Sequence, residues 1–508
     1  MKKTLAAAIS VFAISLSGIA QAQDSLAELI QAGRSAAAIA QIEAGADVNA
    51  AQGDGTTPLH WAVYRLDGEL VERLIGAGAR VDTSNSFGSS PLAEAINAAN
   101  TDLVRRLLDA GADVDSANLD GQTALMLAAR VGSADIAGAL IERGADVNAV
   151  EHWRGQTALM WAADAAAGDV VDLLVGAGAD VEVRALANDW NAQITSEPRA
   201  QYRPTGGLTA LLYSARSGCT QCVEAILDAG ADIDRPNPDG VTALIIAIDN
   251  FRFETAARLL ERGANPHVWD WWGRTALYVA ADVSRMNRRR SDPVEQTGVS
   301  ALQIAERLVA AGIDVNTQLN MHRPSRGGNI GRFVDDLLTT GATPLLRAAI
   351  SHDAPFVELL LGNGALVDLP NVQGVTPLLG AAGMGVSPRD RSVDTSGSVE
   401  QRAIATLELL LAAGADINAA VVPQYNRSAR IARPSSMTER EGQTALFGAV
   451  KWGWGDVVAF LLERGADASI ADARSLTPVD AALGRTGGRD NTVSESIAAA
   501  LQAASQPQ

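Results

Sequence analysis

The residues best suited to chemistry are the two cysteines of the chain, Cys219 and Cys222, which are separated by two residues. In a secreted protein such a pair can form a local disulfide. The same spacing occurs in thiol oxidoreductases, where a thiolate attacks a disulfide. The βαβ pattern typical of those proteins is missing here, and Cys222 occupies an apolar position of a predicted helix. We therefore expect a structural disulfide, with thiol redox chemistry as the alternative. Val223, where haem attachment needs a histidine, excludes that chemistry.

The five histidines are not arranged for catalysis or metal binding. No two of them have the spacing of metal ligands, and His60 lies in a Thr-Pro-Leu-His turn where we expect a local hydrogen bond. A Ser-His-Asp arrangement, a phosphate-binding glycine loop and paired catalytic carboxylates are also missing. The Gly-Ala-Asp segments recur too regularly to be acid–base pairs. We therefore predict that the protein is not an enzyme and has no cofactor, metal or small-molecule substrate.

A repeated unit positions these residues. The stretch Asp120–Ala129, closed by Arg143–Asn148, recurs along most of the chain. Gly121 permits the positive φ of a tight turn, and Thr123 is predicted to cap a helix by accepting from free amides of its first turn. A second amphipathic helix follows, and Gly144 is predicted to end it. Each unit is therefore predicted to contain a turn, a helix, a second helix and an extended finger, in that order.

This pattern resembles the ankyrin repeat, whose period is 33 residues. The resemblance implies an all-α solenoid of about twelve helix-turn-helix units with finger turns. It covers residues 23–504, with degenerate terminal copies at 25–53 and 473–504 that we expect to act as caps. Counted at the residue before the first helical leucine, the copies after the first lie at Pro58, Pro91, Ala124, Ala158, Ala210, Ala243, Ala276, Pro344, Pro377, Ala445 and, in the last copy, Pro478.

The first 22 residues predict a secretory signal peptide. Two lysines precede an apolar run from residue 5 to about residue 19, and Ala20-Gln21-Ala22 has the small-x-small form of a cleavage site. The run is short for a membrane span, and no later stretch is long and apolar enough. An uncleaved anchor is the alternative. We expect cleavage after Ala22, no membrane span afterwards, and a location in the periplasm of a Gram-negative bacterium or outside the cell.

Five insertions interrupt the regular period. Three lengthen the fingers between repeats, near residues 184–205, 315–340 and 418–440. The other two, near residues 284–300 and 386–400, each separate the two helices of a repeat. Leaving out the one near 386–400, they hold 14 arginines against 7 acidic residues, while the chain has a net charge of −18. An acidic chain of this kind is a poor general binder of nucleic acid. Solvated disorder is the alternative reading of these basic segments.

The chain also resembles secreted bacterial ankyrin-repeat proteins with extended loops, through Trp272–Tyr278 and Thr340–Ala349. That resemblance implies a non-catalytic scaffold that binds another protein in the periplasm. An accessory factor that protects or assembles a specific secreted enzyme, for example in oxidative-stress defence, is the narrower alternative. Neither reading names the partner.

The resemblance places partner contacts on the finger turn and on the end of the first helix. Large aromatic residues and arginine dominate protein interfaces, and we expect Trp271 and Trp272 to form one anchor. The alternative is that these aromatic side chains pack against neighbouring turns. The candidates at these places are Tyr64, Arg65, Phe87, Trp153, Arg154, Trp271, Trp272, Arg274, Lys451 and Trp452.

The long fingers supply a second set of candidates. Fingers of such an array project from one edge, and arginine forms a planar fork that fits carboxylates. We expect them to meet an acidic protein or, less favoured, an anionic polymer of the cell envelope. The competing interpretation is that they fold back onto the chain's own acids. The candidates are Arg199, Arg203, Arg323, Arg326, Arg427, Arg430 and Arg433.

Overall fold

The computed structural model describes residues 24–188, 205–285, 298–320, 338, 340–384, 398–422, 440–485 and 493–505. The predicted signal peptide lies outside these residues, as do most of the five insertions and all seven finger arginines. Within the described ranges the predicted all-α architecture is confirmed. Its exception is one antiparallel pair of two-residue strands, β1 (Ala187–Asn188) and β2 (Thr205–Gly206). No helix in these ranges has the length and apolar character needed to cross a membrane.

The chain forms two compact units. The first comprises Met1–Leu119 with Glu142–Gly144, and the second comprises Asp120–Ile141 with Ala145–Gln508. The helices up to Leu119 are α1 (Leu26–Gln31), α2 (Ser35–Glu43), α3 (Pro58–Tyr64), α4 (Gly68–Gly76), α5 (Pro91–Asn97) and α6 (Thr101–Asp109).

The remaining helices continue the alternation of first and second helices. They are α7 (Ala124–Val131), α8 (Ala134–Glu142), α9 (Ala158–Asp164), α10 (Gly168–Gly176), α11 (Ala210–Ser217), α12 (Thr220–Asp228), α13 (Ala243–Asp249), α14 (Phe253–Glu261), α15 (Ala276–Ser284), α16 (Ala301–Ala310), α17 (Pro344–Ile350), α18 (Ala354–Gly362), α19 (Pro377–Leu379) with the π-helix η1 (Gly380–Met384), α20 (Val399–Ala412), α23 (Ala445–Trp452), α24 (Gly455–Glu463), α25 (Pro478–Ala482) and α26 (Glu495–Ala504). The insertion predicted near 386–400 therefore overlaps the start of α20, because that helix begins at Val399.

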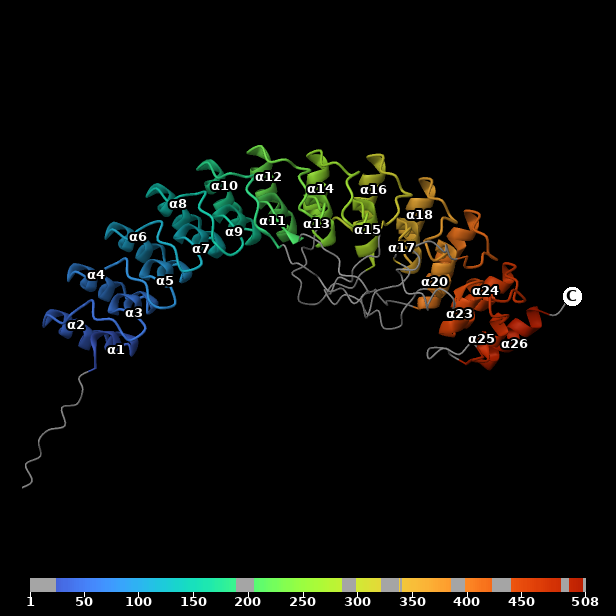
Figure 1. Ribbon diagram of the computed structural model, residues 1–508, viewed down its shortest axis with the longest axis horizontal. Coiled ribbons are helices and arrows are strands. Elements are labelled where there is room, and N and C mark those ends of the chain that lie inside the picture. The colour runs from blue at the N-terminus through green and yellow to red at the C-terminus, as the bar shows by residue number, and fades with distance from the viewer. Residues whose placement is uncertain are drawn as a thin grey trace, which may run out of the picture. The chain divides into compact units, whose positions relative to one another are not determined.

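Within the second unit the helices stack in two layers. The first helices α9, α11, α13, α15 and α17 pack in sequence, and the second helices α10, α12, α14, α16 and α18 form the other layer (Figure 1). Alanines such as Ala162, Ala247 and Ala280 are fully buried in the first layer, where a small side chain allows neighbouring helices to approach closely. Each repeat thus buries its apolar face on the repeats beside it.

The predicted helix starts are confirmed. Thr123 Oγ1 accepts from the amide of Met126 at 3.4 Å, and Thr343 caps α17 in the same way at 3.1 Å. In the turn that precedes α7, Gly121 has φ +79°, and after α8 Gly144 has φ +87°. The Gly-Ala-Asp segments are turns whose carboxylates bind backbone, as where Asp146 accepts from the amide of Asn148 at 2.9 Å.

The fingers without an insertion end in a tight hairpin that is closed by a polar side chain. In one of them the amide of Asn237 donates to the carbonyl of Val241 at 3.0 Å, and Asn237 Oδ1 accepts from the amides of Asp239 and Val241 at 3.0 and 2.8 Å. In the second unit most consecutive hairpins are joined by a single backbone bond, such as that from the amide of Trp271 to the carbonyl of Asp239 at 2.8 Å. The Asn237 hairpin cannot donate this bond to the hairpin before it, because Pro238 has no N–H. The hairpins of this unit therefore form a row beside the helices.

The finger insertions leave this row intact. At the base of the second one, the amide of Leu319 donates to the carbonyl of Ala342 at 3.0 Å, and the amide of Gly341 donates back to Leu319 at 2.8 Å. The third has the same pair of bonds, from Val421 to Gln443 at 3.0 Å and from Gly442 to Val421 at 2.9 Å. The second and third insertions thus begin and end at a hairpin base, where an aliphatic residue replaces the polar side chain that closes a short loop.

Glycine is required where one hairpin meets the next. Gly374 has φ +78°, and a Cβ placed on it would lie 2.3 Å from the carbonyl oxygen of Val422. Gly364 has the similar φ of +85° with no atom within 4 Å of a Cβ. An alanine at Gly364 would therefore cost backbone strain alone, whereas an alanine at Gly374 would cost both backbone strain and a steric clash.

We expect Gly364→Ala to lower the free energy of unfolding by about 1 kcal/mol, the cost of a left-handed alanine. Gly374→Ala should lose roughly 1–3 kcal/mol more, because its methyl group also forces the next hairpin away. Urea unfolding followed by circular dichroism measures both. Equal losses for the two variants would contradict the close approach of the hairpins.

The last repeat depends on one buried leucine. Leu501 of α26 is fully buried, in a helix that packs on α24 and α25, whereas the adjacent Gln502 is exposed. We expect Leu501→Ala to destabilise this repeat by about 2 kcal/mol or more and to promote aggregation, because the apolar face of α24 loses its cover. Gln502→Ala is the matched control and should leave the melting temperature unchanged. The measurements are the melting temperature and light scattering of both variants. Equal values for the two variants would contradict the capping role.

Candidate protein-binding surface

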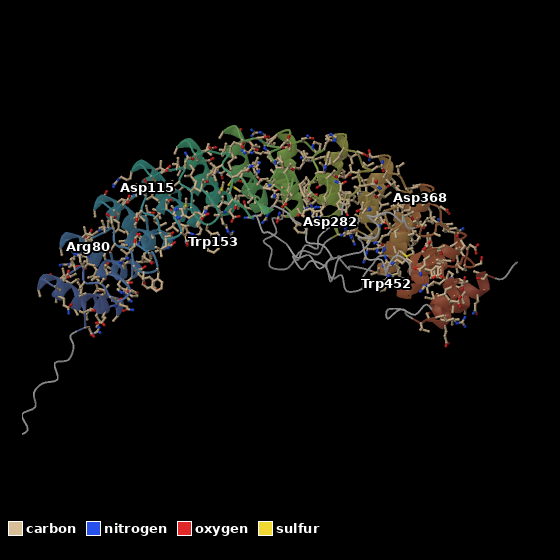
Figure 2. The ribbon with its side chains drawn as sticks, in the orientation of Figure 1. Arg80, Asp115, Trp153, Asp282, Asp368 and Trp452 are labelled. Carbon is tan, nitrogen blue, oxygen red and sulfur yellow. A yellow bond between two sulfur atoms is a disulfide. The ribbon has the colours of Figure 1, made fainter. Side chains whose placement is uncertain are left out.

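Large apolar side chains project from the hairpins of the second unit. We call Trp153, Leu186, Trp269, Trp271 and Val422 the tip row. All five are exposed although each is a large apolar side chain, and Trp153 is 74% exposed. Figure 2 shows Trp153 extending away from the helices. Exposed apolar residues gathered in one row of loops are typical of a protein-binding surface.

The hairpin backbone fixes the positions of these side chains. The amide of Leu186 donates to the carbonyl of Arg154 at 2.6 Å, so the hairpin bearing Leu186 is held against the one bearing Trp153. The carboxylate of Glu151 accepts from the amides of Trp153 and Arg154 at 2.6 and 2.7 Å. The side chains of Trp153 and Arg154 are both exposed, and their contact with a partner stays a prediction.

The first unit has an exposed group of its own. Phe87 lies at a hairpin tip and is 77% exposed. Tyr64 and Arg65 are exposed at the end of α3, where the Tyr64 ring contacts Trp61 edge-on at 5.7 Å. Arg65 also donates to the carbonyl of Gln31 at 3.2 Å. These three candidates therefore lie on the surface, and their contact with a partner stays a prediction.

The predicted anchor of Trp271 with Trp272 is wrong. Trp271 and Trp272 are the two turn residues of the hairpin that Asp270 and Arg274 close, and they face opposite ways: Trp269 and Trp271 are 62% and 40% exposed, whereas Asp270 and Trp272 are 2% and 4% exposed. Trp272 therefore faces the protein interior and cannot contact a partner. Trp269, which the sequence reasoning missed, is the residue that shares the outer face with Trp271.

Arg274, predicted to bind a partner, is also internal. Its Nε donates to Asp270 Oδ2 at 2.6 Å, Asp249 lies 3.7 Å from its guanidinium, and the group stacks over the Trp272 ring at 5.2 Å. Burial raises the pKa of Asp270, while Arg274 and backbone amides oppose that rise. The three hydrogen bonds that Asp270 accepts from Arg274 and the Trp272 amide favour the charged pair.

Trp452 and Lys451 are half-buried and serve the fold. Trp452 Nε1 donates to the carbonyl of Gly383 at 2.7 Å, and this bond ties α23 to η1. A Cβ on Gly383 would lie 2.7 Å from the Trp452 ring, so the contact is close. Lys451 lies over the same ring at 4.9 Å. The sequence reasoning placed both residues on the binding surface because it could not show that η1 covers the indole.

A buried ion pair joins two first helices. Arg347 Nε donates to Asp282 Oδ1 at 2.6 Å, and a terminal nitrogen of Arg347 donates to the carbonyl of Asp282 at 3.2 Å. Both side chains are buried; Figure 2 labels Asp282 on α15. A nearer-surface counterpart pairs Arg216 with Asp164 at 2.6 Å. Charges on the first helices thus bind neighbouring repeats, and losing one partner of a buried pair costs about 3–5 kcal/mol.

The structure joins Cys219 and Cys222 in a disulfide at the turn between α11 and α12. Cys219 is the N-cap residue of α12, and the amide of Cys222 donates to its sulfur at 3.1 Å. Cys219 is 9% exposed and Cys222 is fully buried. This turn lies at the far end of α11 from the hairpin, a separation of about 12 Å for an eight-residue helix.

His352 is buried beside the π-helix. Its Nε2 lies 2.9 Å from the carbonyl oxygen of Ala381, which requires a proton on that nitrogen, and its ring contacts Trp454 edge-on at 5.6 Å. Burial, with smaller contributions from Arg402 and Arg285, lowers the pKa of His352 to about 4. Burial also lowers the pKa of His60, which bridges two repeats through Thr57 and the carbonyl of Ser89.

We expect acid to destabilise the protein through His352. Its folded pKa of about 4 lies below the unfolded value of 6.5, so its contribution is complete above pH 6.5 and declines as the pH falls toward 4. Most carboxylates stay charged between pH 7 and pH 5. The free energy of unfolding measured over this range should therefore show the loss that comes from His352. His352→Asn keeps an amide donor and tolerates the residue's φ of +55°, and it should reduce the pH dependence. Exposed His267→Asn is the control; an equal reduction there would contradict the assignment.

Comparisons with known proteins agree with this geometry. A family model described as ankyrin repeats (3 copies) matches residues 26–118, 97–185, 186–270 and 211–318, and the single ankyrin repeat model matches residues 441–473. Neurogenic locus notch homolog protein 1 of Danio rerio is 31% identical over 200 residues, covering 35% of this chain and 8% of that protein. Mitochondrial disaggregase of Bos taurus is 30% identical over 158 residues, covering 29% and 21%.

The chain therefore spans only a small part of the length of these relatives. The ankyrin-repeat models match more than half of the 508 residues, in the same ranges where the structure shows paired helices and hairpins. The chain belongs to the ankyrin-repeat family.

Proposed function

We propose that the protein is a non-catalytic scaffold that binds another protein through the tip row, in the periplasm of a Gram-negative bacterium. The ankyrin repeats themselves imply a scaffold for protein–protein interaction. The observation that carries the proposal is the exposure of Trp153, Trp269 and Trp271 on two hairpins of the row. Tryptophan is among the residues that contribute most to binding energy at protein interfaces.

The first helices in the middle of the second unit support this choice of surface. Residues Ala276–Val283 of α15 and Pro344–Ile350 of α17 are buried throughout, so they offer no free side chains. Their charged residues Asp282 and Arg347 bind each other. A partner of this region therefore meets the hairpins first.

The basic finger insertions extend this surface. Their described bases, at Leu186, Leu319 and Val421, belong to the hairpin row, so the arginines follow residues next to the tip row. We propose that Arg199, Arg203, Arg323, Arg326, Arg427, Arg430 and Arg433 contact acidic groups around an apolar patch on the partner. Charge contacts at an interface rim mainly raise the association rate and weaken with salt.

The location rests on the N-terminal sequence. Residues 1–22 have the charged start, apolar run and small-x-small site of a secretory signal. The Cys219–Cys222 disulfide suits an oxidising compartment. A partner that proves to be a secreted enzyme would narrow the role to an accessory factor for that enzyme.

We expect Trp269→Ala/Trp271→Ala to reduce partner capture at least about tenfold, the effect of losing a hot spot of some 1.4 kcal/mol or more. The melting temperature should change little, because both side chains are exposed. The measurement is quantitative capture from periplasmic extract by the tagged protein, with bound proteins identified by mass spectrometry. Leu173→Ala, a partly exposed apolar residue of α10, is the matched control.

The same assay separates the tip row from the fingers. Reversing the seven finger arginines should weaken capture at low salt and less so at high salt, since the electrostatic attraction is then screened. If the double tryptophan variant captures the partner unchanged and Leu173→Ala loses capture, the interface lies on the second helices and the tip-row proposal is wrong.

A further inference from the structure

We propose that the Cys219–Cys222 disulfide is exchangeable and oxidises a dithiol of another protein, with the sulfur of Cys219 as the atom attacked. This inference is independent of the tip row, since the pair lies in the turn between α11 and α12. The chemistry needs a reachable sulfur, a leaving sulfur and an environment that stabilises a thiolate. The structure provides each of these.

The two sulfurs differ in access. Cys219, in the turn, is largely buried but keeps 9% exposure, whereas Cys222, one helical turn further into α12, is fully buried. Of the two residues, Cys219 is therefore the one that an incoming thiolate would meet first, and Cys222 is the leaving sulfur. This asymmetry is the division between attacked and resolving cysteines that thiol–disulfide exchange requires.

A purely structural role explains the pair poorly. The corresponding residues of other repeats, Asp67, Asn100 and Ser133, accept from the N3 amide of their second helix without a covalent bond. Cys219 makes the same cap through its sulfur at 3.1 Å. A disulfide that closes a loop of three-residue separation constrains the unfolded chain least, because stabilisation grows with loop length.

The surroundings favour a thiolate on a reduced Cys219. The sulfur lies at the N-terminus of the nine-residue helix α12, where backbone N–H groups and the helix dipole attract negative charge. The Arg252 side chain crosses Gly218, the preceding residue, with its Cδ 2.6 Å from the position of a Cβ there. Arg252 Nε also donates to the carbonyl of Arg216 at 3.3 Å, which holds the guanidinium at this turn.

Three acidic groups of the neighbouring repeat have partners of their own. Asp169 and Asp172 accept from Gln221 Nε2 at 3.1 and 2.8 Å. Asp164 pairs with Arg216 at 2.6 Å. The carboxylates are therefore held by their own partners, and Arg252 is the cation next to the residue before Cys219.

One equivalent of a partner dithiol reduces one Cys219–Cys222 disulfide. A partner thiolate attacks Cys219 Sγ, forms a mixed disulfide and breaks the Cys219–Cys222 bond, and the Cys222 sulfur leaves with the electron pair and takes up a proton. The second partner thiolate then attacks the partner sulfur of the mixed disulfide, and Cys219 leaves as a thiolate. Two electrons pass to the pair, and the partner gains a disulfide.

The test uses the full-length mature protein and two probes, reduced ribonuclease A as a protein dithiol and glutathione buffers for the equilibrium. We expect reduced ribonuclease A to reduce the pair stoichiometrically under native conditions, read by maleimide mass shift with unchanged circular dichroism. Cys222→Ser should accumulate a mixed disulfide between Cys219 and glutathione. Reduction of the pair only after denaturation would overturn the proposal.

A charge variant tests the thiolate argument separately from folding. Arg252→Gln should lower the equilibrium constant for reduction by glutathione roughly threefold to tenfold, because the reduced state loses a nearby cation. Arg258→Gln is the matched control; this arginine of α14 pairs with Glu224 and Glu261 and lies away from the turn. Equal constants for the two variants, with equal melting temperatures, would show that Arg252 does not stabilise the thiolate and would overturn this environment as the basis of exchange.

Discussion

Close packing between the alanine-lined first helices of neighbouring repeats is the constraint on which the other features depend. Ala162, Ala215, Ala247 and Ala280 are fully buried where these helices meet in the second unit. A repeat has too little apolar surface to form a core alone, so its stability comes from its neighbours. The helix caps and the hairpin bonds then fix the register in which one repeat meets the next. Charged residues on these helices are consequently used within the fold, as in the pair of Asp282 with Arg347.

The hairpin row explains how the chain accepts long insertions. Short hairpins are closed by a side-chain acceptor such as Asn237 or Asn371, and the lengthened ones carry Leu319 or Val421 at that position. The backbone bonds between neighbouring hairpins are made at the two ends of the second insertion, by the amide of Asn320 and the carbonyl of Thr340. Insertions therefore change what the surface presents without changing how the repeats stack, which is why the binding surface and the fold are largely independent.

Sequence periodicity predicted the fold because each repeat carries its own local signals. Thr123 and Gly121 act through hydrogen bonds and φ angles that need no distant contact. The candidate site was harder, since the exposure of a turn residue depends on how the hairpin packs against its neighbours. Trp271 and Trp272 are adjacent and identical in type, and only the folded turn shows which of them faces outward. Trp269 was missed for the same reason, and Trp452 was misplaced because η1 covers it.

The most direct test of the account is hydroxyl-radical footprinting of the tagged protein, alone and in complex with the partner it retains. The account predicts that Trp153, Trp269 and Trp271 are oxidised readily in the free protein and are protected in the complex. Trp272 should react slowly in both states, because it faces the interior. Protection confined to the second helices, with the tip-row tryptophans still reactive in the complex, would contradict the assignment of the hairpins as the binding surface.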